Sequence, residues 1–344
     1  MYNNYMDTKD KILKYLKHKK SASGKEIAEL LAISRQAVNK HLKVLIQKGK
    51  VVKEGHTKGA VYKIAHRIKP PQRMNKRYDL LDLEEDKVFK ELELRLNLRK
   101  NLRKKAFDIV NYTFTEILNN AIEHSQSKNC WIEVILDQYM YNFIIRDYGI
   151  GIFYSIYSKF NLPDETSAIQ ELIKGKTTTM REKHTGEGVF FTSKSGDKVS
   201  FRSHKINLIF DNIKKDIFVE EKKYIKGTEV KFGISKTSKR DLKEIFNQYS
   251  PEEYDYRFEK TKIFIKLFHK EYISRSEAKR LIFGLDKFKE IILDFKGVKS
   301  IGQGFADEVF RVFKKQHPNI VIKVENLNPI LRSIINHVVD NKIN

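Results

Sequence analysis

In residues 141–151 the chain reads YNFIIRDYGIG, an apolar run that ends in an aspartate and two glycines. The first five of these residues are mainly apolar, as are residues 131–136. The two segments predict a β-hairpin that carries Asp147 at the end of its second strand. Because Gly149 and Gly151 have no Cβ, the backbone can approach a ligand closely while the Asp147 carboxylate accepts a hydrogen bond from an exocyclic amine.

A helix precedes this hairpin. Apolar residues recur at helical spacing between Phe107 and His124, and within that stretch Glu116 and Asn120 are four residues apart on one face. A carboxylate and a carboxamide at this spacing can polarise a water molecule and complete the coordination of a hard cation. Alone, the pair is typical of a solvated helix face, so its interpretation depends on the neighbouring motifs.

Two later motifs contain glycine. Thr185-Gly186-Glu187-Gly188 precedes the apolar start of a helix, whose N-terminal amides can face phosphates. Gly227-Thr228 precedes a predicted strand at residues 230–232.

In this order, the motifs resemble the GHKL superfamily of gyrase-type, chaperone, histidine-kinase and mismatch-repair ATPases. The resemblance covers roughly residues 85–235 and implies a Bergerat α/β sandwich that binds ATP and Mg2+. It implies Glu116 as general base, Asn120 as magnesium ligand and Asp147 as adenine contact. The other implied cofactor contacts belong to the phosphate, lid and closing-strand motifs: Gly149, Gly151, Gly186, Gly188 and Thr228.

The run KGKTTT at residues 174–179 is similar to part of a P-loop. The first glycine of a P-loop would fall at Gln170, and no strand is predicted before it, so this interpretation fails. Within the GHKL resemblance, Lys176 and Thr177 lie in the lid, where they either contact phosphate or belong to a solvated loop.

The histidines bear on the kind of ATP chemistry. No histidine lies between His66 and His124, which disfavours a self-phosphorylating histidine kinase. The run from Asn120 to His124 is more similar to anti-sigma-factor-type serine kinases, which phosphorylate a partner.

The N-terminal segment has a different pattern. Apolar residues at helical spacing predict helices over residues 7–17, 23–31 and 34–48, and Ser23 with Glu26 forms a capping box. Two valine-containing segments, at residues 51–52 and 61–62, predict the strands of a short hairpin.

This order resembles the winged helix-turn-helix of bacterial transcription regulators, most closely over residues 24–42. The resemblance implies binding to double-stranded DNA, although some winged domains bind proteins or pair with themselves. It places five residues in the major groove: Ser34, Arg35, Gln36, Asn39 and Lys40. It places three more on the flanking DNA backbone: Lys53, His56 and Lys58.

Charge is concentrated in the same segment. Residues 1–70 hold 17 Lys and Arg against 5 Asp and Glu, a net charge of +12, which leaves +11 of the total +23 for the other 274 residues. A strongly basic domain attached to a less basic remainder of the chain indicates binding to a polyanion, most simply nucleic acid. The alternative is a solvated basic surface.

Other features of composition exclude whole classes of protein. Cys130 is the only cysteine, so an intrachain disulfide and a cysteine-based zinc cluster are impossible. No apolar run approaches the roughly 20 residues that span a bilayer, and the N-terminus lacks a signal-peptide pattern, so we expect a cytoplasmic location.

A chain of 344 residues predicts two or three domains. We expect a winged helix at residues 1–66 and a GHKL domain at residues 85–235. The linker at residues 67–84 contains Pro70-Pro71, and a second linker at residues 236–254 contains Ser250-Pro251.

Residues 255–344 form the expected third domain. Strands predicted at residues 262–268, 291–295 and 320–324 alternate with helices at residues 274–285, 306–314 and 329–338, which indicates an α/β layer with a mostly parallel sheet.

Residues 293–306 resemble the strand, loop and helix of STAS-like domains, the fold of anti-sigma-factor antagonists. In the antagonists a phosphorylatable serine opens the helix. This chain has Gln303 there and Ser300 nearby, so a plain α/β interaction module is the alternative.

The fold class is therefore multidomain, with an α+β winged helix, a GHKL α/β sandwich and a STAS-like α/β domain. The leading hypothesis is a transcriptional or defence-type regulator in which a slowly hydrolysing Mg-ATP site switches DNA or partner binding. One alternative is a serine/threonine protein kinase that acts on its own STAS-like segment or on a partner, and another is a scaffold with a structural ATP. A protein partner for the STAS-like domain and a homodimer are further expectations.

Overall fold

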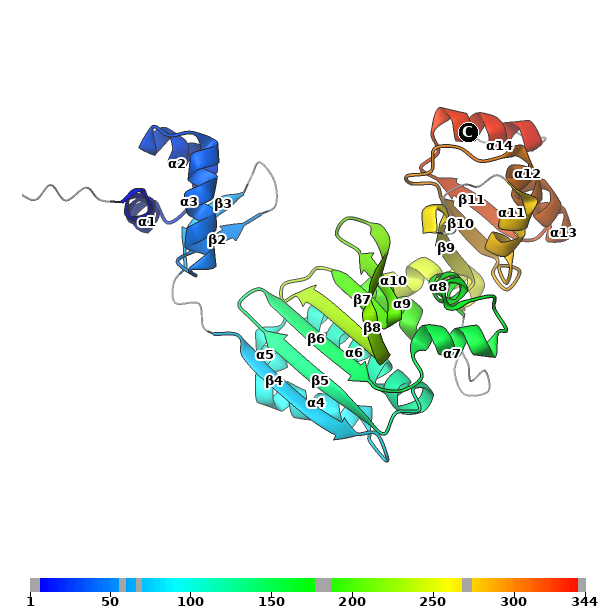
Figure 1. Cartoon of the computed structure of the whole chain (residues 1–344), viewed down its shortest axis with the longest axis horizontal. Helices are drawn as coiled ribbons and strands as arrows, with labels where there is room; N and C mark the ends of the chain where they lie inside the picture. The colour runs from blue at the N-terminus through cyan, green and yellow to red at the C-terminus, as the bar shows by residue number, and fades with distance from the viewer. Residues whose placement is uncertain (1–6, 56–59, 66–69, 177–186, 268–273, 340–344) are drawn as a thin grey trace, which may run out of the picture. The chain divides into compact units, whose positions relative to one another are not determined.

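The computed structural model describes residues 7–55, 60–65, 70–176, 187–267 and 274–339. The chain divides into two compact units, Met1–Pro71 and Gln72–Asn344 (Figure 1). The division falls directly after the proline pair that marked a boundary in the sequence. Within the described ranges, every helix is too short or too polar to cross a membrane.

The described part of the N-terminal unit contains a helical group with a small antiparallel sheet. Its elements are α1 (Thr8–Lys19), β1 (Ala22–Ser23), α2 (Gly24–Leu31), α3 (Arg35–Gln47), β2 (Val51–Glu54) and β3 (Val61–Ile64). The sheet has the order β1-β3-β2. Ser23 Oγ accepts a hydrogen bond from the Glu26 amide, and Glu26 Oε2 accepts one from the Ser23 amide, so the predicted capping box is confirmed.

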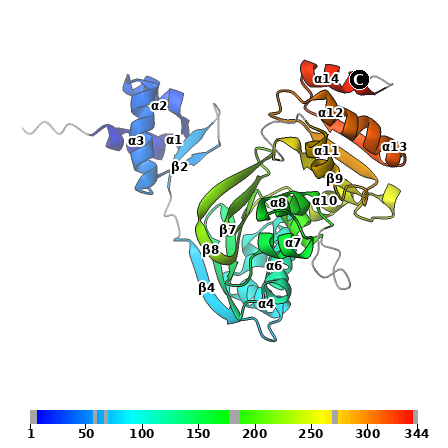
Figure 2. The ribbon, with the colours of Figure 1, turned by 45° about the vertical axis from the view of Figure 1, so that its right-hand side comes forward.

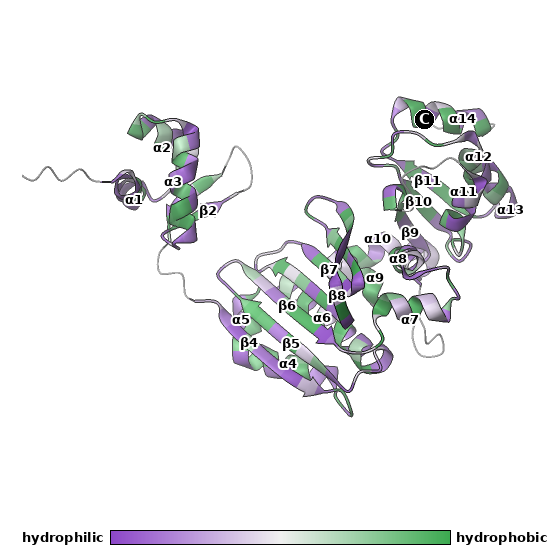
Figure 3. Ribbon diagram, viewed as in Figure 1, coloured by the Kyte–Doolittle hydropathy of each residue, from purple (hydrophilic) through white to green (hydrophobic). Residues whose placement is uncertain are grey.

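The second unit is built on an antiparallel sheet of five strands with the order β4-β5-β6-β8-β7. The strands are β4 (Gln72–Asp79), β5 (Asn129–Leu136), β6 (Met140–Asp147), β7 (Lys198–Asp211) and β8 (Asp216–Ser235). Buried residues alternate with partly exposed ones along β5 and β6. Figure 3 shows that the ribbon of this sheet carries both hydrophobic and hydrophilic residues. The predicted hairpin is confirmed, and Asp147 lies opposite Cys130 in it.

Strand β4 corrects the prediction of a linker over residues 67–84. It pairs along its whole length with β5, and two of its own side chains, Met74 and Tyr78, are buried. Because an edge strand buries only one side, two apolar residues are enough to hold it, and its polar sequence was misinterpreted as a loop.

Helices pack on one face of this sheet (Figures 1 and 2). They are α4 (Glu85–Leu96), α5 (Leu98–Asn101), α6 (Lys104–His124), α7 (Ile152–Lys159), α8 (Glu165–Lys174) and α9 (Gly188–Ser195). The ring of Phe114 on α6 meets Phe143 edge-on at 5.5 Å, and Phe143 stacks on Phe232 at 5.0 Å. These contacts fix α6 across the central strands.

Helix α10 (Leu242–Tyr249) corrects the second predicted linker, residues 236–254. Asp241 caps the helix and pairs with Lys105 of α6 at 2.8 Å, while Tyr249 is buried. The apolar residues Ile245, Phe246 and Tyr249 have helical spacing that the surrounding lysines and serines obscured. This segment therefore packs against the sheet domain instead of separating two domains.

The C-terminal region has a parallel sheet, as predicted. The order of its strands is β11-β10-β9. Its strands are β9 (Lys260–Phe264), β10 (Glu290–Asp294) and β11 (Val321–Glu325). Its helices are η1 (Glu252–Tyr254), η2 (Ile265–Leu267), α11 (Arg275–Ile282), α12 (Gln303–Ala306), the π-helical η3 (Asp307–Phe313), α13 (Lys314–Gln316) and α14 (Pro329–Val338). A second capping box, between Ser274 and Glu277, begins α11.

Candidate functional site

One cavity of about 380 Å3 brings together residues from several segments of the second unit. Glu116 and Asn120 come from α6, Asp147 from the end of β6, Gly188 from the start of α9 and Thr228 from β8. Gly151 also lines the cavity. The structure therefore brings together six of the residues that the sequence selected.

Asp147 is held rigidly at one end of this cavity. Its carboxylate is buried, and its Oδ1 atom accepts hydrogen bonds from the amides of Gly149 at 2.9 Å and Thr228 at 3.2 Å. Burial raises the pKa of the Asp147 carboxyl, while these two hydrogen bonds oppose the shift. The Thr228 hydroxyl accepts a hydrogen bond from the Ile152 amide at 2.9 Å, which fixes the loop after the strand.

The lining around Asp147 is largely apolar. Five side chains contribute to it: Ile145, Ile156, Leu172, Phe201 and Val230. A carboxylate in such surroundings favours a flat, apolar ligand that carries a hydrogen-bond donor, because a donor compensates the buried acceptor.

The glycines near Asp147 are required by packing. A Cβ on Gly149 would lie 1.7 Å from the Ser125 carbonyl oxygen, and one on Gly227 would lie 2.4 Å from the Asp147 carbonyl oxygen. The close approach at Gly149 is to Ser125, and Gly149 is not among the residues that line the cavity. A ligand contact of Gly149 stays a prediction.

Gly188 and Glu116 touch at the other side of the cavity. A Cβ on Gly188 would lie 1.8 Å from Glu116 Oε2, so a larger residue at this position would require the Glu116 side chain to move. Burial, with the nearby Glu116 and Glu187 carboxylates, raises the pKa of the Tyr112 hydroxyl. The cavity thus has an acidic side formed by α6 and the start of α9.

Asn120 contributes a polar group that the described residues do not satisfy. Its Nδ2 atom is buried and has no hydrogen-bond partner among them. Because rotation of the amide exchanges its nitrogen and oxygen, this side chain can offer either a donor or an acceptor to a ligand. Elsewhere in the described ranges, no group of three or more His, Cys, Asp or Glu residues could hold a metal ion.

Lys176 lies outside the cavity, which corrects its assignment as a cofactor contact. Its ammonium pairs with Glu259 at 3.0 Å and donates to the Lys287 carbonyl at 3.0 Å. Both partners belong to the C-terminal region. Thr177 and Gly186 lie outside the described residues.

Sequence reasoning missed the aromatic wall of the cavity. Phe190, Phe191 and Phe246 line it together with His124 and Ser155. The Val189-Phe190-Phe191 run was interpreted only as the start of a helix. Two adjacent phenylalanines directly after a glycine motif were the available signal.

The predicted DNA-contacting residues lie in the N-terminal unit. Arg35, Gln36, Asn39 and Lys40 are exposed on α3, and Lys53 is exposed on β2. Ser34 is exposed too, but its Oγ accepts a hydrogen bond from the Ala37 amide at 3.2 Å and so caps α3. His56 and Lys58 lie outside the described residues.

The segment compared with the antagonist phosphorylation site forms the predicted loop and helix start. Gln303 is the first residue of α12, and both Gln303 and Ser300 are exposed.

Comparison with known families identifies both ends of the chain. A model described as an HTH domain matches residues 8–59, and a model described as a STAS-like domain of unknown function matches residues 277–331. No curated protein matches the chain. The protein is therefore a multidomain chain with an N-terminal helix-turn-helix domain, which indicates a DNA-binding regulator, and a C-terminal STAS-like region.

Proposed function

We propose that this protein is a DNA-binding regulator whose central cavity binds Mg-ATP, with occupancy of the cavity switching DNA or partner binding. One observation carries the proposal. Glu116, Asn120, Asp147 and Thr228 come from three separate elements and line a single cavity of about 380 Å3, a volume suited to a small-molecule ligand. Their combination is the one that the GHKL resemblance implies for nucleotide binding.

Two residues of the cavity would bind different parts of Mg-ATP. Asp147 is held by backbone amides and would accept a hydrogen bond from the exocyclic amine of adenine. Asn120 would help to hold the magnesium ion, and its buried, unpaired amide suits a ligand-facing role. The ion would neutralise phosphate charge when bound.

Glu116 is the residue that we assign to hydrolysis. Its carboxylate lies against the start of α9, where helix amides favour an anion. From there it would accept a proton from an attacking water. Gly188 supports this arrangement by allowing the contact.

Titration calorimetry with Mg-ATP tests the proposal directly. We expect wild-type protein to bind ATP in a magnesium-dependent way. We expect Glu116→Ala to lose turnover while it keeps much of the affinity, because the carboxylate acts on water and not on the base. Absence of magnesium-dependent binding to the full chain would contradict the proposal.

The switch itself needs a second measurement. Duplex DNA selected by the full chain should bind with different affinity in the presence and absence of Mg-ATP, and Asp147→Asn should abolish the difference. Phosphate transfer from labelled ATP to Ser300 or to another protein, detected by mass spectrometry, would favour the serine/threonine kinase alternative. Light scattering with and without ATP tests the proposed homodimer, and copurification with and without residues 255–344 tests a protein partner.

A further inference from the structure

Three consecutive residues at the end of α8, Lys174 to Lys176, contact the C-terminal region. Lys174 is fully buried, and its ammonium donates to Glu171 Oε1 and to the Phe283 carbonyl, both at 2.7 Å. The Lys174 carbonyl accepts a hydrogen bond from the buried Thr261 hydroxyl at 2.6 Å. Removal of a polar partner while the Lys174 ammonium stays buried would leave an uncompensated charge, so this contact depends on these particular partners.

The next two residues continue the contact. Gly175 has a φ of 79°, and a Cβ there would lie 2.7 Å from the ring of Phe258 and 2.9 Å from that of Phe190. The Lys176 ammonium pairs with Glu259 and lies 4.9 Å from the centre of the Phe288 ring. Strand β9 and the segment before it therefore recognise α8 by charge, hydrogen bond and shape.

Helix α9 is held by the same region. The Phe190 ring lies 4.5 Å from the Phe258 ring, and the Phe191 ring lies 5.3 Å from it. Phe190 and Phe191 also line the cavity, as does Leu172 of α8. One wall of the cavity thus belongs to the hydrophobic core of the C-terminal region.

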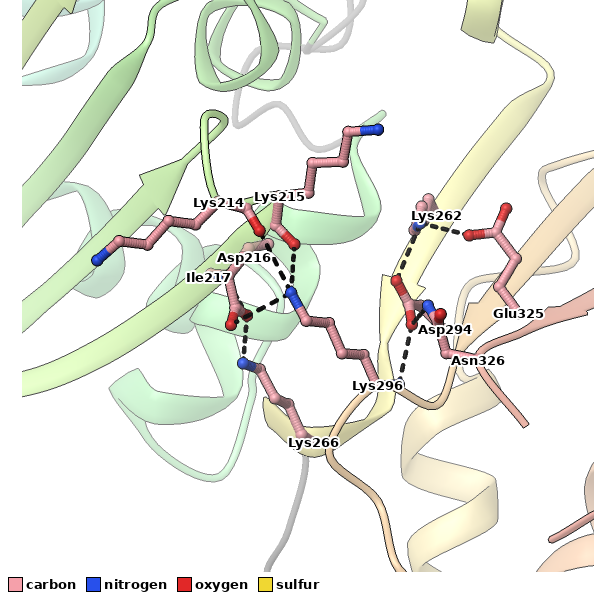
Figure 4. A network of polar contacts seen from close by, with 10 residues as sticks. All are labelled: Lys214, Lys215, Asp216, Ile217, Lys262, Lys266, Asp294, Lys296, Glu325 and Asn326. Atoms are coloured by element: carbon pink, nitrogen blue, oxygen red, sulfur yellow. Dashed lines mark hydrogen bonds and ion pairs between the residues drawn. The ribbon is translucent and has the colours of Figure 1, made fainter. Parts of the chain in front are cut away.

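A separate contact orients this region against the sheet domain (Figure 4). The Lys296 ammonium donates to the carbonyls of Lys214 and Lys215 at 3.3 and 3.2 Å, and Lys266 pairs with Asp216. Asp294 accepts a hydrogen bond from the Lys296 amide at 2.9 Å and so holds the loop that carries this lysine. Contacts at two places oppose rotation of the C-terminal region about either one.

We propose that docking of the STAS-like region onto α8 and α9 sets the affinity of the cavity for its nucleotide, with Glu259 and Thr261 as positioning residues. The proposal rests on the proposed function of the cavity. Docking holds Gly188, Phe190 and Phe191 in the arrangement that lines the cavity, so ligand binding and docking stabilise each other. Thermodynamic linkage makes this coupling reciprocal: a ligand that tightens docking binds more weakly when docking is loosened.

The test uses the full chain with Glu259→Gln and Thr261→Val, each of which removes one contact to α8 with little change of volume. We expect the Kd for Mg-ATP to rise at least about fivefold in each variant, the lower end of typical coupling. Asp307→Asn is the matched control, because Asp307 pairs with Arg275 and Arg311 of its own region, and the Kd of this variant should be unchanged.

Hydrogen exchange supplies the reciprocal readout. Mg-ATP should slow amide exchange in residues 258–264 of the wild type, which do not line the cavity, and should do so less in the two variants. Wild-type ATP affinity in both variants, with no effect of ATP on this exchange, would overturn the coupling while leaving ATP binding intact.

A wild type that binds no ATP would contradict the proposed function, and the coupling is then decided without ligand. Glu259→Gln and Thr261→Val should still speed exchange in residues 187–195 relative to Asp307→Asn. Unchanged exchange there would show that docking does not position the cavity wall.

Discussion

The helix-turn-helix unit and the cavity differ in how their functional side chains are brought together. Arg35, Gln36, Asn39 and Lys40 lie on one helix of 13 residues, whose apolar stripe packs inside the same unit. The cavity takes its lining from residues as far apart as Tyr112 and Phe246. A surface made by one helix tolerates change elsewhere, whereas a cavity made by many segments responds to distant substitutions.

The largest expected effect tests whether the close packing of Gly149 against Ser125, next to Asp147, is needed for the fold around the cavity. Gly149→Ala should lower the free energy of unfolding by about 3 kcal/mol or more, because its Cβ would overlap the Ser125 carbonyl. Denaturant unfolding of the full chain measures this loss.

Gly297→Ala is the control for steric overlap. Gly297 has a positive φ, 82°, which Gly149 lacks, but its Cβ would lie 3.8 Å from the nearest atom, so a loss of about 1 kcal/mol from backbone strain, without overlap, is expected. Equal losses in the two variants would contradict the packing argument.

The next effect concerns the helix-turn-helix unit alone. Arg35→Glu with Lys40→Glu should weaken duplex binding by on the order of a hundredfold and reduce the salt slope by about 2, because two phosphate or base contacts are lost. Fluorescence anisotropy at several salt concentrations measures both quantities.

Lys14→Glu, on the exposed side of α1, controls for net charge and should change binding much less. ATP affinity should stay the same in the double variant and in the control, because the cavity lies in a different unit. Unaltered DNA binding by the double variant would show that α3 is not the recognition helix.

Asp147→Asn should separate binding from stability in the cavity. We expect ATP affinity to fall by about 10- to 50-fold, the value of a hydrogen bond to a charged group, as measured by calorimetry. Folding stability should not fall with it. Since the folded pKa of Asp147 is raised, the unfolded chain binds fewer protons above the ordinary pKa near 4, and this residue's contribution to stability declines as pH rises through that window.

Replacement by Asn removes that decline, so the variant should match or exceed wild-type stability at pH 7. A fall in stability as large as the fall in affinity would show that Asp147 serves the fold and not the ligand.

The smallest expected effect concerns Lys194 of α9, which lies where α9 packs against residues far away in the chain. The half-buried Lys194 of α9 places its ammonium 5.0, 5.4 and 5.8 Å from the rings of Phe190, Phe210 and Phe264. Burial, with a smaller contribution from Lys262, lowers the pKa of Lys194 to about 7. Lys194→Met should therefore stabilise the fold at pH 7 by about 1 to 2 kcal/mol.

The pH dependence has a definite sign. Between the folded pKa and the ordinary value near 10.4 the unfolded chain binds more protons, so Lys194 makes stability rise with pH. The advantage of the Met variant should shrink from pH 7 to pH 10, as unfolding at each pH will show. Lys198→Met, at an exposed lysine, is the control for the loss of one charge. A difference for Lys194→Met that does not vary with pH would contradict the argument.

Much of the fold could be predicted because its signals are local. The capping boxes at Ser23 and Ser274, the hairpin before Asp147 and the range of α14 follow from patterns within about 10 residues. Strand β4 and helix α10 could not, because each buries few apolar side chains and depends on a partner far away in the chain.

The candidate site shows the same limit. The spacing of Glu116 and Asn120 and the aspartate at a strand end selected residues that do line the cavity. Lys176 was wrongly assigned, because a lysine after a glycine has the same sequence whether it faces a phosphate or Glu259.

The sequence by itself determined most of the elements, the charge of the helix-turn-helix unit and several polar residues of the cavity, because these depend on side-chain chemistry and short-range spacing. Only the tertiary structure decided that Gly149 packs against Ser125, that Phe190 and Phe191 form a wall, and that the STAS-like region holds α8. Those features depend on contacts between residues far apart in the chain. Such contacts have no fixed sequence spacing, so no local pattern predicts them.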